Sequence, residues 1–334
     1  MSSKRMPRDA IAILGAGRWG LTLAECAARN GHRVLLWTSS RSGAARLQET
    51  RASDELPELE ALHERVEPTA KLQEAVHQSH MLLLAVAAGE VRALCRSLGD
   101  HADPSHVVVH AIRGLEPDSL ERPSRVIRRE TALRKVGAML GPALVGEMLA
   151  GRPNAFVVAS RYPEVAERMT TAFANDALRV YTSADLAGVE VSAAAGAVGA
   201  LAVGMALELQ LGPATLATLL TRSAAEMARV VAAAGGKPAS AVGLAGLGEL
   251  LALRESESRE VEAGRAFARG ASVKDVAKQI GGGGAIDAAL TFAALADRLG
   301  VTAHIAAVVA RVLRGEIDAR EAVFALMRLD PMGE

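Results

Sequence analysis

The sequence predicts an α/β protein in which a doubly wound parallel sheet is followed by an all-helical C-terminal domain. In the first half, short continuous apolar runs, typical of strands buried on both faces, alternate with helical segments. From about residue 184 the strand-like runs stop, and long Ala-rich helical segments follow. We therefore place a domain boundary near Leu186, which gives a first domain of residues 1–186 and a second of residues 187–334.

Seven strands are predicted in the first domain. They cover residues 11–14, 33–37, 81–86, 106–111, 136–140, 155–159 and 179–181, with helical stretches such as 89–98 and 163–175 between them. In a sheet of this kind, ligands bind beyond the carboxyl ends of the strands. The first strand ends in glycines, so we expect the binding site there.

The second domain is predicted to contain five long helical segments. They cover residues 189–209, 214–234, 272–279, 285–299 and 303–313, and Pro213 and Gly235-Gly236 separate the earlier ones. Residues 191–207 carry no charge and approach the length that spans a membrane. They are mostly Ala and Gly, so we predict a closely packed core helix and no membrane association.

Composition excludes several classes of protein. The 334 residues include 38 acidic and 38 basic side chains, which is unlike the basic footprint of a nucleic-acid binder. The two cysteines show no metal-ligand spacing, so neither a disulfide framework nor a metal site is expected. Residues 1–9 are charged and have no apolar core of a signal peptide. These observations predict a cytoplasmic protein.

The first strand runs directly into a glycine motif. Gly15, Gly17 and Gly20 have the spacing GxGxxG between a strand and a helix. In that setting Gly15 permits a tight turn, Gly17 lets a pyrophosphate approach the backbone, and Gly20 lets the helix pack on the strand. Free N–H groups at the helix start favour negative charge. The motif predicts a Rossmann-like dinucleotide site, the alternative being a glycine turn without a ligand.

The end of the second strand bears on the choice of cofactor. NAD sites commonly place an acid there for the ribose hydroxyls. Here the chain continues Thr38-Ser39-Ser40-Arg41, which has no acid but has hydroxyls and a cation for a 2′-phosphate. This pattern favours NADP slightly, while NAD and an ordinary polar loop both remain open.

Several separated motifs together resemble one family. They are Gly15-Ala-Gly17-Arg-Trp-Gly20, Ala28-Arg-Asn-Gly31-His, Arg113-Gly-Leu-Glu-Pro117, Gly141-Pro142, Gly146-Glu147-Met-Leu-Ala-Gly151, Val180-Tyr-Thr182, Gly188-Val-Glu190 and Gly243-Leu-Ala-Gly-Leu-Gly248. With them the chain resembles the bacterial NAD(P)-dependent glycerol-3-phosphate dehydrogenases along nearly its whole length. The resemblance implies a Rossmann domain, a helical domain for substrate and dimerisation, a homodimer, and a small phosphorylated substrate. It also implies hydride transfer between dihydroxyacetone phosphate and glycerol 3-phosphate.

The resemblance assigns residues to the cofactor. Besides Gly15, Gly17 and Gly20, it implies roles for Arg18 and Trp19 in the same turn, and for Glu147. Ser39 and Arg41 join them from the second strand. Glu147, like Glu190, has an alternative interpretation as a helix cap or as the partner of an arginine.

The chain departs from the family where substrate is expected to bind. The principal catalytic lysine of the family, followed by asparagine, corresponds to Gly196 and Ala197. Arg113 replaces a second lysine and keeps the charge, but it is a poor proton donor. His110, close by in sequence, is the local candidate for a substitute acid; its alternative is a hydrogen-bonded strand histidine.

Further departures follow the glycine-rich segment 243–248. Glu249 stands at the family's aspartate, and Leu253 at its threonine. Arg259 corresponds to the phosphate-binding arginine if a one-residue gap is allowed, and Glu260 then takes the place of an asparagine. We expect Arg259 and Glu249 to contact substrate.

Two functional hypotheses follow. The first is an NAD(P)-dependent dehydrogenase resembling glycerol-3-phosphate dehydrogenase. The second is a catalytically inactive member that acts as a dinucleotide-binding sensor or a partner-binding protein, because Gly196 replaces the lysine.

Overall fold

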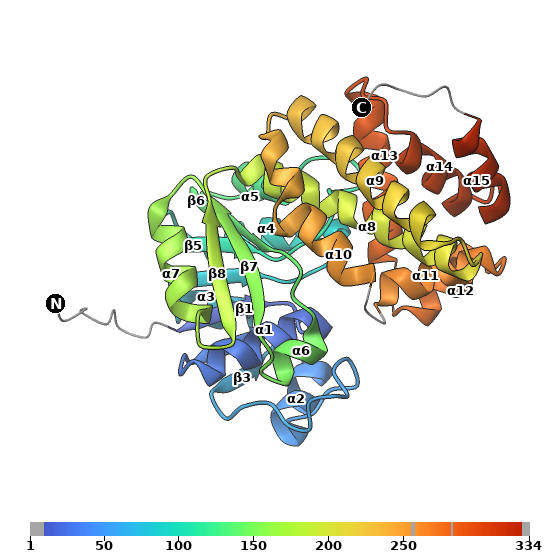
Figure 1. Ribbon diagram of the computed structural model, residues 1–334. Helices are drawn as coiled ribbons and strands as arrows, with labels where there is room; N and C mark the ends of the chain where they lie inside the picture. Colours follow the sequence, from blue (N-terminus) through green and yellow to red (C-terminus); the bar gives the residue numbers. More distant parts are fainter. Residues whose placement is uncertain (1–9, 255–257, 282, 329–334) are drawn as a thin grey trace. The chain divides into compact units, whose positions relative to one another are not determined.

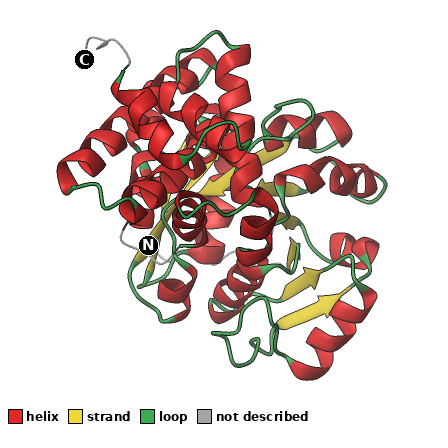
Figure 2. Cartoon of the chain, turned by 90° about the vertical axis from the view of Figure 1, so that its right-hand side faces the viewer, coloured by secondary structure: helices red, strands yellow, loops and turns green. Residues whose placement is uncertain are grey.

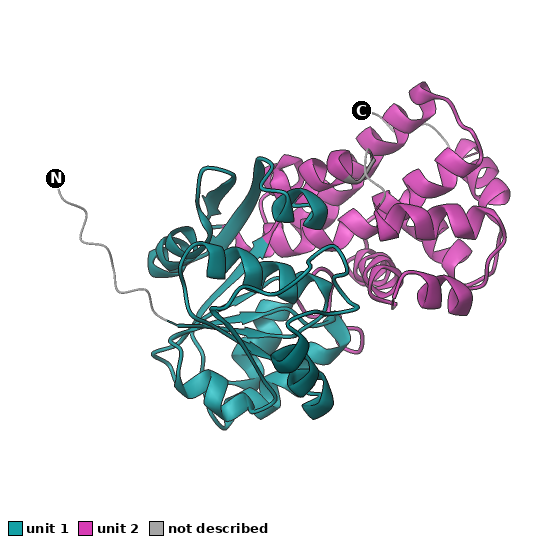
Figure 3. Ribbon diagram, turned by 90° about the horizontal axis from the view of Figure 1, so that it is seen from below, with its two compact units in different colours: residues 1–112, 123–139, 143–184 teal, residues 113–122, 140–142, 185–334 magenta. Residues whose placement is uncertain are grey.

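The computed structural model describes residues 10–254, 258–281 and 283–328, which form two compact units (Figure 3). Unit 1 comprises the described residues up to Ile112 together with 123–139 and 143–184. Unit 2 comprises the described residues from Asp185 onwards together with 113–122 and 140–142. Two short segments from the first half of the chain are thus part of the second unit.

Unit 1 is built on an eight-stranded sheet, most strands of which are labelled in Figure 1. Its strands are β1 (Ile11–Leu14), β2 (Val34–Trp37), β3 (Val66–Thr69), β4 (Met81–Leu84), β5 (Val107–His110), β6 (Lys135–Leu140), β7 (Asn154–Ser160) and β8 (Leu178–Ser183). The order of the strands in the sheet is β3-β2-β1-β4-β5-β6-β7-β8. Each neighbouring pair from β3 to β6 in this order is parallel, and β7 is parallel to β8. The predicted parallel, doubly wound sheet is confirmed. The strand order reverses between β1 and β4, which is where such folds bind ligands.

Helices cover both faces of this sheet, as Figure 2 shows. They are α1 (Arg18–Arg29), α2 (Arg41–Thr50), α3 (Leu72–His77), α4 (Val91–Gly99), α5 (Pro123–Glu130), α6 (Val145–Leu149) and α7 (Pro163–Phe173). Ile11 and Ile13 of β1 face one core with α1 and α7, while Ala12 and Leu14 face the other with α3, α4 and α5. Burial on both faces explains why the central strands are continuous apolar runs.

The edge strand β3 was not predicted from the sequence. Its four residues, Val66-Glu67-Pro68-Thr69, include a charge and a proline, both of which are rare in central strands. β3 pairs with β2 alone, and an edge position is where proline is tolerated. The strand is specified by the pairing of Val66 and Pro68 with Val34 and Leu36 rather than by a local pattern.

Unit 2 is helical. It contains α8 (Leu186–Glu208), α9 (Pro213–Ala233), α10 (Glu249–Arg254), α11 (Arg259–Ala268), α12 (Val273–Gln279), α13 (Gly284–Arg298), α14 (His304–Leu313) and α15 (Ala319–Met327). Two short turns, η2 (Pro238–Val242) and η3 (Leu244–Gly248), lie between α9 and α10. The predicted segments correspond to α8, α9, α12, α13 and α14. The dense charge of residues 254–265 hid the apolar face of α11, which buries Val261 and Phe267.

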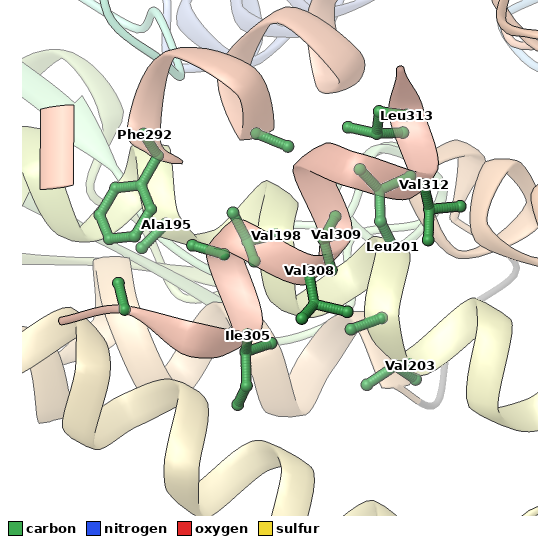
Figure 4. Packing of buried hydrophobic residues seen from close by; sticks show 14 of the residues in the cluster. Ala195, Val198, Leu201, Val203, Phe292, Ile305, Val308, Val309, Val312 and Leu313 are labelled. Carbon is green, nitrogen blue, oxygen red and sulfur yellow. The ribbon is translucent and has the colours of Figure 1, made fainter. Parts of the chain in front are cut away.

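The long helix α8 is the core of unit 2. Among the described residues it is the one helix long and apolar enough to cross a membrane, but 94% of its most apolar window is buried inside the protein. Its Val198 and Leu201 pack with Phe292 of α13 and with Ile305 and Val309 of α14 (Figure 4). The interpretation as a packed core helix is confirmed within this unit.

A polar cap fixes the start of α8. Asp185 accepts hydrogen bonds from Gly188 N at 3.0 Å, from Lys237 N at 2.7 Å and from Ser240 Oγ at 2.6 Å. One carboxylate therefore satisfies a first-turn amide of α8 and also holds the segment that follows α9.

Small residues let neighbouring helices approach α8 closely. A Cβ at Gly204 would lie 2.1 Å from Val261 O and 2.9 Å from Gly264 Cα of α11. A Cβ at Gly199 would lie 2.2 Å from a methyl carbon of Leu250 in α10. By contrast, a Cβ at Gly196 would lie no nearer than 3.5 Å to any other atom, an ordinary contact.

We predict that Gly204→Ala destabilises the protein by about 1–3 kcal/mol, because the methyl group overlaps the backbone of α11. Gly196→Ala on the same helix is the matched control, and it should be neutral or stabilising because Ala has the higher helix propensity. Denaturant unfolding of both variants measures the difference. Equal stability of the two would contradict this account of the packing between α8 and α11.

Candidate functional site

The glycine turn of unit 1 is as tight as its spacing predicts. Gly15 has a φ of +124°, and a Cβ there would lie 2.3 Å from Ala85 O, just after β4. A Cβ at Gly20 would lie 1.9 Å from Gly15 O. No larger residue fits either position without moving the backbone. The turn therefore brings the end of β1, the start of α1 and the end of β4 together.

Gly17 differs from the other two glycines because its surroundings are open. A Cβ there would meet no atom within 4 Å, and Gly17 is itself exposed. It is the N-cap of α1, and neither a side-chain cap nor an acid occupies the first turn. The first-turn amides of a helix have no partner inside the helix. The space and the donors fit a pyrophosphate group.

Arg18 and Trp19 flank this turn, with their side chains held by other parts of unit 1. Arg18 makes a bidentate ion pair with Glu58, with Nη1 2.7 Å from Oε2. The Trp19 ring packs edge-on against Phe156 at 6.1 Å between centroids. Glu147 lies half-buried in the first turn of α6. The predicted cofactor roles of all three remain predictions.

The end of β2 carries the hydroxyls and the cation expected from the sequence. Ser40 is the N-cap of α2 and accepts a hydrogen bond from Gly43 N at 3.0 Å, so its hydroxyl is engaged. Ser39 and Arg41 on either side are exposed. Ser40 is exposed as well, so all three side chains are presented to solvent.

His110 is the last residue of β5 and is fully buried. Its Nδ1 accepts a hydrogen bond from Ile112 N at 3.3 Å. This contact fits a hydrogen-bonded strand histidine, the alternative to a substitute acid.

Unit 2 contains a cluster of three charged side chains that are far apart in the sequence. Arg113 Nε lies 2.9 Å from Glu249 Oε1, and Arg113 Nη1 lies 3.5 Å from Glu260 Oε1. Leu115, two residues after Arg113, is fully buried in the helical core and anchors this segment to unit 2. We call Arg113, Glu249 and Glu260 the charge cluster.

The elements around Glu249 explain its position. The π turn Leu244–Gly248 leads directly into α10, with Gly248 N bonded to Gly243 O at 3.0 Å. Leu250 packs against Gly199 of α8, and Gly196 lies on the same helix face one turn earlier. The carboxyl carbon of Glu249 is therefore 3.5 Å from where a Cβ at residue 196 would be.

Glu249 is buried without a hydrogen bond. It is 1% exposed, and in the described part of the chain neither carboxyl oxygen has a hydrogen-bond partner. The 2.9 Å approach of Arg113 is close enough for charge attraction but lacks hydrogen-bond alignment. Burial raises the pKa of Glu249 to about 7, against the attraction of Arg113 and with a contribution from Glu260. This carboxyl exchanges its proton near neutral pH.

Arg113 remains a cation. Burial opposes its charge, but Glu249 and Glu260 raise the pKa of the guanidinium further above its ordinary value. The side chain is 33% exposed, so the charge cluster reaches the surface through it. An arginine with so high a pKa keeps its charge and is a poor proton donor. The predicted catalytic role of Arg113 stays a prediction.

The remaining predicted substrate residues lie on neighbouring elements of unit 2. Arg259 begins α11, is exposed, and donates from Nη1 to Ile280 O at 3.2 Å. Ala197 is half-buried against the core on α8, and Leu253 lies in α10 with its side chain outside the described part of the structure. Glu190 forms a buried pair with Arg122 at 2.9 Å, the alternative that the sequence left open.

The sequence alone did not reveal how the charge cluster is assembled. It singled out Arg113, Glu249 and Glu260 separately, as three departures from a family pattern. Their pairing needs the fold, because 136 residues separate Arg113 from Glu249. The one change of charge among the three positions is Glu260, which stands where the family has an asparagine.

We predict that Glu249→Gln becomes more stable relative to the wild type as pH rises from about 4.5 to 8. In the wild type the unfolded chain ionises this carboxyl above pH 4.5 while the folded protein does so only near pH 7, so stability falls across that window. The relative gain should reach about 3 kcal/mol. Thermal unfolding at a series of pH values measures it.

Asp185→Asn is a control for which the stability relative to the wild type should change with pH in the opposite direction. Partial burial opposes its ionisation, but hydrogen bonds from Ser240, Lys237 and Gly188 lower the pKa of Asp185. Its contribution to stability is therefore present above the ordinary carboxyl pKa and is lost as pH falls. A pH-independent difference for Glu249→Gln would show that Glu249 is ionised throughout.

The chain is similar to known proteins along nearly its whole length. Residues 10–166 match the family described as NAD-dependent glycerol-3-phosphate dehydrogenase N-terminus, and residues 185–324 match its C-terminus. Glycerol-3-phosphate dehydrogenase [NAD(P)+] of Halorhodospira halophila is 35% identical over 330 residues, covering 97% of this chain and 98% of that protein. The enzyme of the same name from Thioalkalivibrio sulfidiphilus is 35% identical over 333 residues, covering 98% and 100%.

Solved structures are similar as well. The crystal structure of glycerol-3-phosphate dehydrogenase from Coxiella burnetii superposes with a TM-score of 0.92 at 26% identity, covering 97% of this chain and 100% of that one. The yeast enzyme gives a TM-score of 0.80 at 17% identity over 95% and 99% of the two chains, a likeness of fold. From the two family matches and the relatives at 35% identity over the whole chain, the protein belongs to the NAD(P)-dependent glycerol-3-phosphate dehydrogenase family.

Proposed function

We propose that this protein interconverts dihydroxyacetone phosphate and glycerol 3-phosphate with a nicotinamide dinucleotide as the hydride carrier. The observation that carries the proposal is the match of both halves of the chain to this family, with a glycine turn that keeps room for a pyrophosphate at Gly17. The substituted lysine position, Gly196, is the feature behind the non-catalytic alternative. The comparisons give that alternative no support.

The chain's own residues suggest how it binds the cofactor. Amides at the start of α1 and the open position at Gly17 would hold the pyrophosphate, and Arg18 and Trp19 would border it. Ser39 and Arg41, exposed after β2, would take the 2′-phosphate of NADP, which we prefer over NAD. When bound, the nicotinamide supplies or accepts the hydride at the substrate carbon.

Cations of unit 2 are proposed to hold the substrate. Arg259 is exposed at the start of α11, where it can reach a phosphate. Arg113 is positioned to polarise a substrate oxygen, because its N–H groups are not aligned on Glu249. We propose residues 1–186 as the cofactor domain, apart from the segments 113–122 and 140–142 that belong to unit 2, and residues 187–334 as the substrate and dimerisation domain. We also propose that the protein is a homodimer and that it is located in the cytoplasm.

The first experiment measures oxidation of NADH and NADPH by micromolar protein with dihydroxyacetone phosphate. Dihydroxyacetone is the matched substrate without the phosphate, and we expect much slower turnover with it because it lacks the group that arginines bind. We expect the wild type to turn over dihydroxyacetone phosphate. Turnover by Gly196→Lys alone, with cofactor binding intact in both proteins, would instead support a protein that has lost catalysis at residue 196.

The cofactor preference has its own test. We predict that Arg41→Ala weakens NADPH binding by about tenfold or more and leaves NADH binding unchanged, because a charge-assisted contact to the 2′-phosphate is lost. Fluorescence titration of both cofactors measures the two dissociation constants. Arg46→Ala is the matched control on the same helix, since Arg46 pairs with Asp54 at 2.9 Å. Parallel losses for NADH and NADPH would rule out a 2′-phosphate role for Arg41.

A further inference from the structure

Among the described residues, unit 2 buries four carboxylates, and their partners differ. Glu116 accepts hydrogen bonds from Ser119 N at 2.8 Å and from Ser119 Oγ. Glu190 accepts a hydrogen bond from Arg122 Nη1 at 2.9 Å. Glu226 accepts from Ile305 N at 2.9 Å and from Ala306 N at 3.3 Å, and so caps α14. Glu249 has no hydrogen bond to either oxygen from the described residues. A buried polar group left without a partner costs free energy, so this exception calls for a role outside folding.

The charges around Glu249 favour one extra proton. The cluster holds one guanidinium and two carboxylates, so it carries a net negative charge if both acids ionise. One proton makes it neutral, and Glu249 is the more buried acid, at 1% exposure against 24% for the Glu260 side chain. Burial raises the pKa of Glu249 to about 7, which is suited to exchanging a proton at neutral pH. A protonated Glu249 offers an O–H group that nothing in the described chain accepts.

The neighbouring helix supplies no competing acid at this point. Residue 196 is glycine, and the place of its missing side chain adjoins the carboxyl carbon of Glu249 at 3.5 Å. Reduction of a ketone needs a proton for the oxygen that gains the electron pair. Arg113 keeps its proton, so among the charge cluster only a glutamate can deliver one.

We propose that Glu249 is the general acid–base residue of this enzyme and exchanges a proton with the substrate oxygen that Arg113 binds. This inference rests on the function proposed above. Arg113 Nε is 2.9 Å from Glu249 Oε1, so an oxygen held by the guanidinium lies next to the carboxyl group. Arg113 is the positioning cation, and Glu249 carries the proton.

The step balances in both directions. In reduction, the hydride brings two electrons to the carbonyl carbon, the C=O π pair moves to oxygen, and the Glu249 O–H bond breaks as its proton joins that oxygen. Glu249 is left as a carboxylate and regains its proton from solvent. In oxidation, the Glu249 carboxylate takes the hydroxyl proton, and an oxidised nicotinamide, when bound, would supply the acceptor for the hydride that leaves the carbon.

The kinetic test compares Glu249→Gln with two other variants. We expect Glu249→Gln to lower kcat for reduction by about 100-fold or more, with the dissociation constant for NADPH unchanged. Glu249→Asp should restore part of kcat and retain a pH dependence. Glu226→Gln is the matched control for removing a buried carboxylate from the same unit. It should leave kcat unchanged because Glu226 accepts its hydrogen bonds from amides at the start of α14 and is not part of the charge cluster.

The pH profile separates proton transfer from a merely structural role. In the wild type, kcat for reduction should fall as pH rises through about 7, and kcat for oxidation should rise over the same range. Glu249→Gln should lose both dependences. A readout that needs no turnover is infrared difference spectroscopy of the wild type against Glu249→Gln. It should show the C=O stretch of a protonated carboxyl that disappears with a midpoint near pH 7.

The outcomes distinguish this inference from the proposed function. If the wild type turns over dihydroxyacetone phosphate but Glu249→Gln keeps its kcat and pH profile, the function stands and the inference is overturned. The inference is overturned in the same way if His110→Asn, rather than Glu249→Gln, removes the pH dependence. If the wild type shows no turnover with any phosphorylated triose, both are overturned.

Discussion

The close packing of small residues along α8 is the constraint on which unit 2 depends. Gly204 lets α11 approach to backbone distance, and Gly199 admits Leu250 of α10. The same helix supplies Val198 and Leu201 to the core shared with α13 and α14. Because α10 is pressed against α8 at Gly199, Glu249 at its first residue is brought beside Gly196. The packing that builds the unit therefore also builds the charge cluster.

The glycines of unit 1 act by a different physical rule. A Cβ at Gly15 or Gly20 would overlap neighbouring backbone atoms, so neither position accepts a larger residue. A Cβ at Gly17 would meet open space. The turn is therefore closely packed at Gly15 and Gly20, while no side chain caps the start of α1 beside Gly17. Both features suit a pyrophosphate. Backbone amides bind its charge, and the space left by the absent side chain of Gly17 accommodates its volume.

The sequence was sufficient for much of the fold because its signals are local. Apolar segments predicted seven of the strands. Proline and glycine residues marked the ends of the long helices. It was insufficient for β3, whose Glu67 and Pro68 have no strand pattern, and for α11, whose apolar face lies in a run of charge. Both are specified by what they pair with or pack against, which a single chain does not display.

The same distinction applies to the site. The glycine turn is a contiguous motif, so its position and open geometry were predictable. The contact of Arg113 with Glu249 depends on the burial of Leu115 in the helical core, which carries residues 113–122 into unit 2. From the sequence alone, the missing lysine at residue 196 and the glutamate at residue 249 are therefore two separate departures from the family. In the fold they are adjacent, and the absent side chain lies beside the buried carboxyl.

The buried position of Glu249 beside Gly196 lowers the stability of the fold, which is a reason to assign it a function. Burying a carboxyl that ionises near pH 7 works against folding at neutral pH, since the unfolded chain ionises it more readily. Glu190 and Glu226 offset part of the cost of burial by accepting hydrogen bonds from Arg122 and from the amides of α14, although burial still raises the pKa of Glu226. Glu249 accepts no hydrogen bond from the described residues, although a shorter or apolar residue would fit a helical core more easily. A substrate oxygen held by Arg113 would give the O–H group of Glu249 the partner that these residues do not supply.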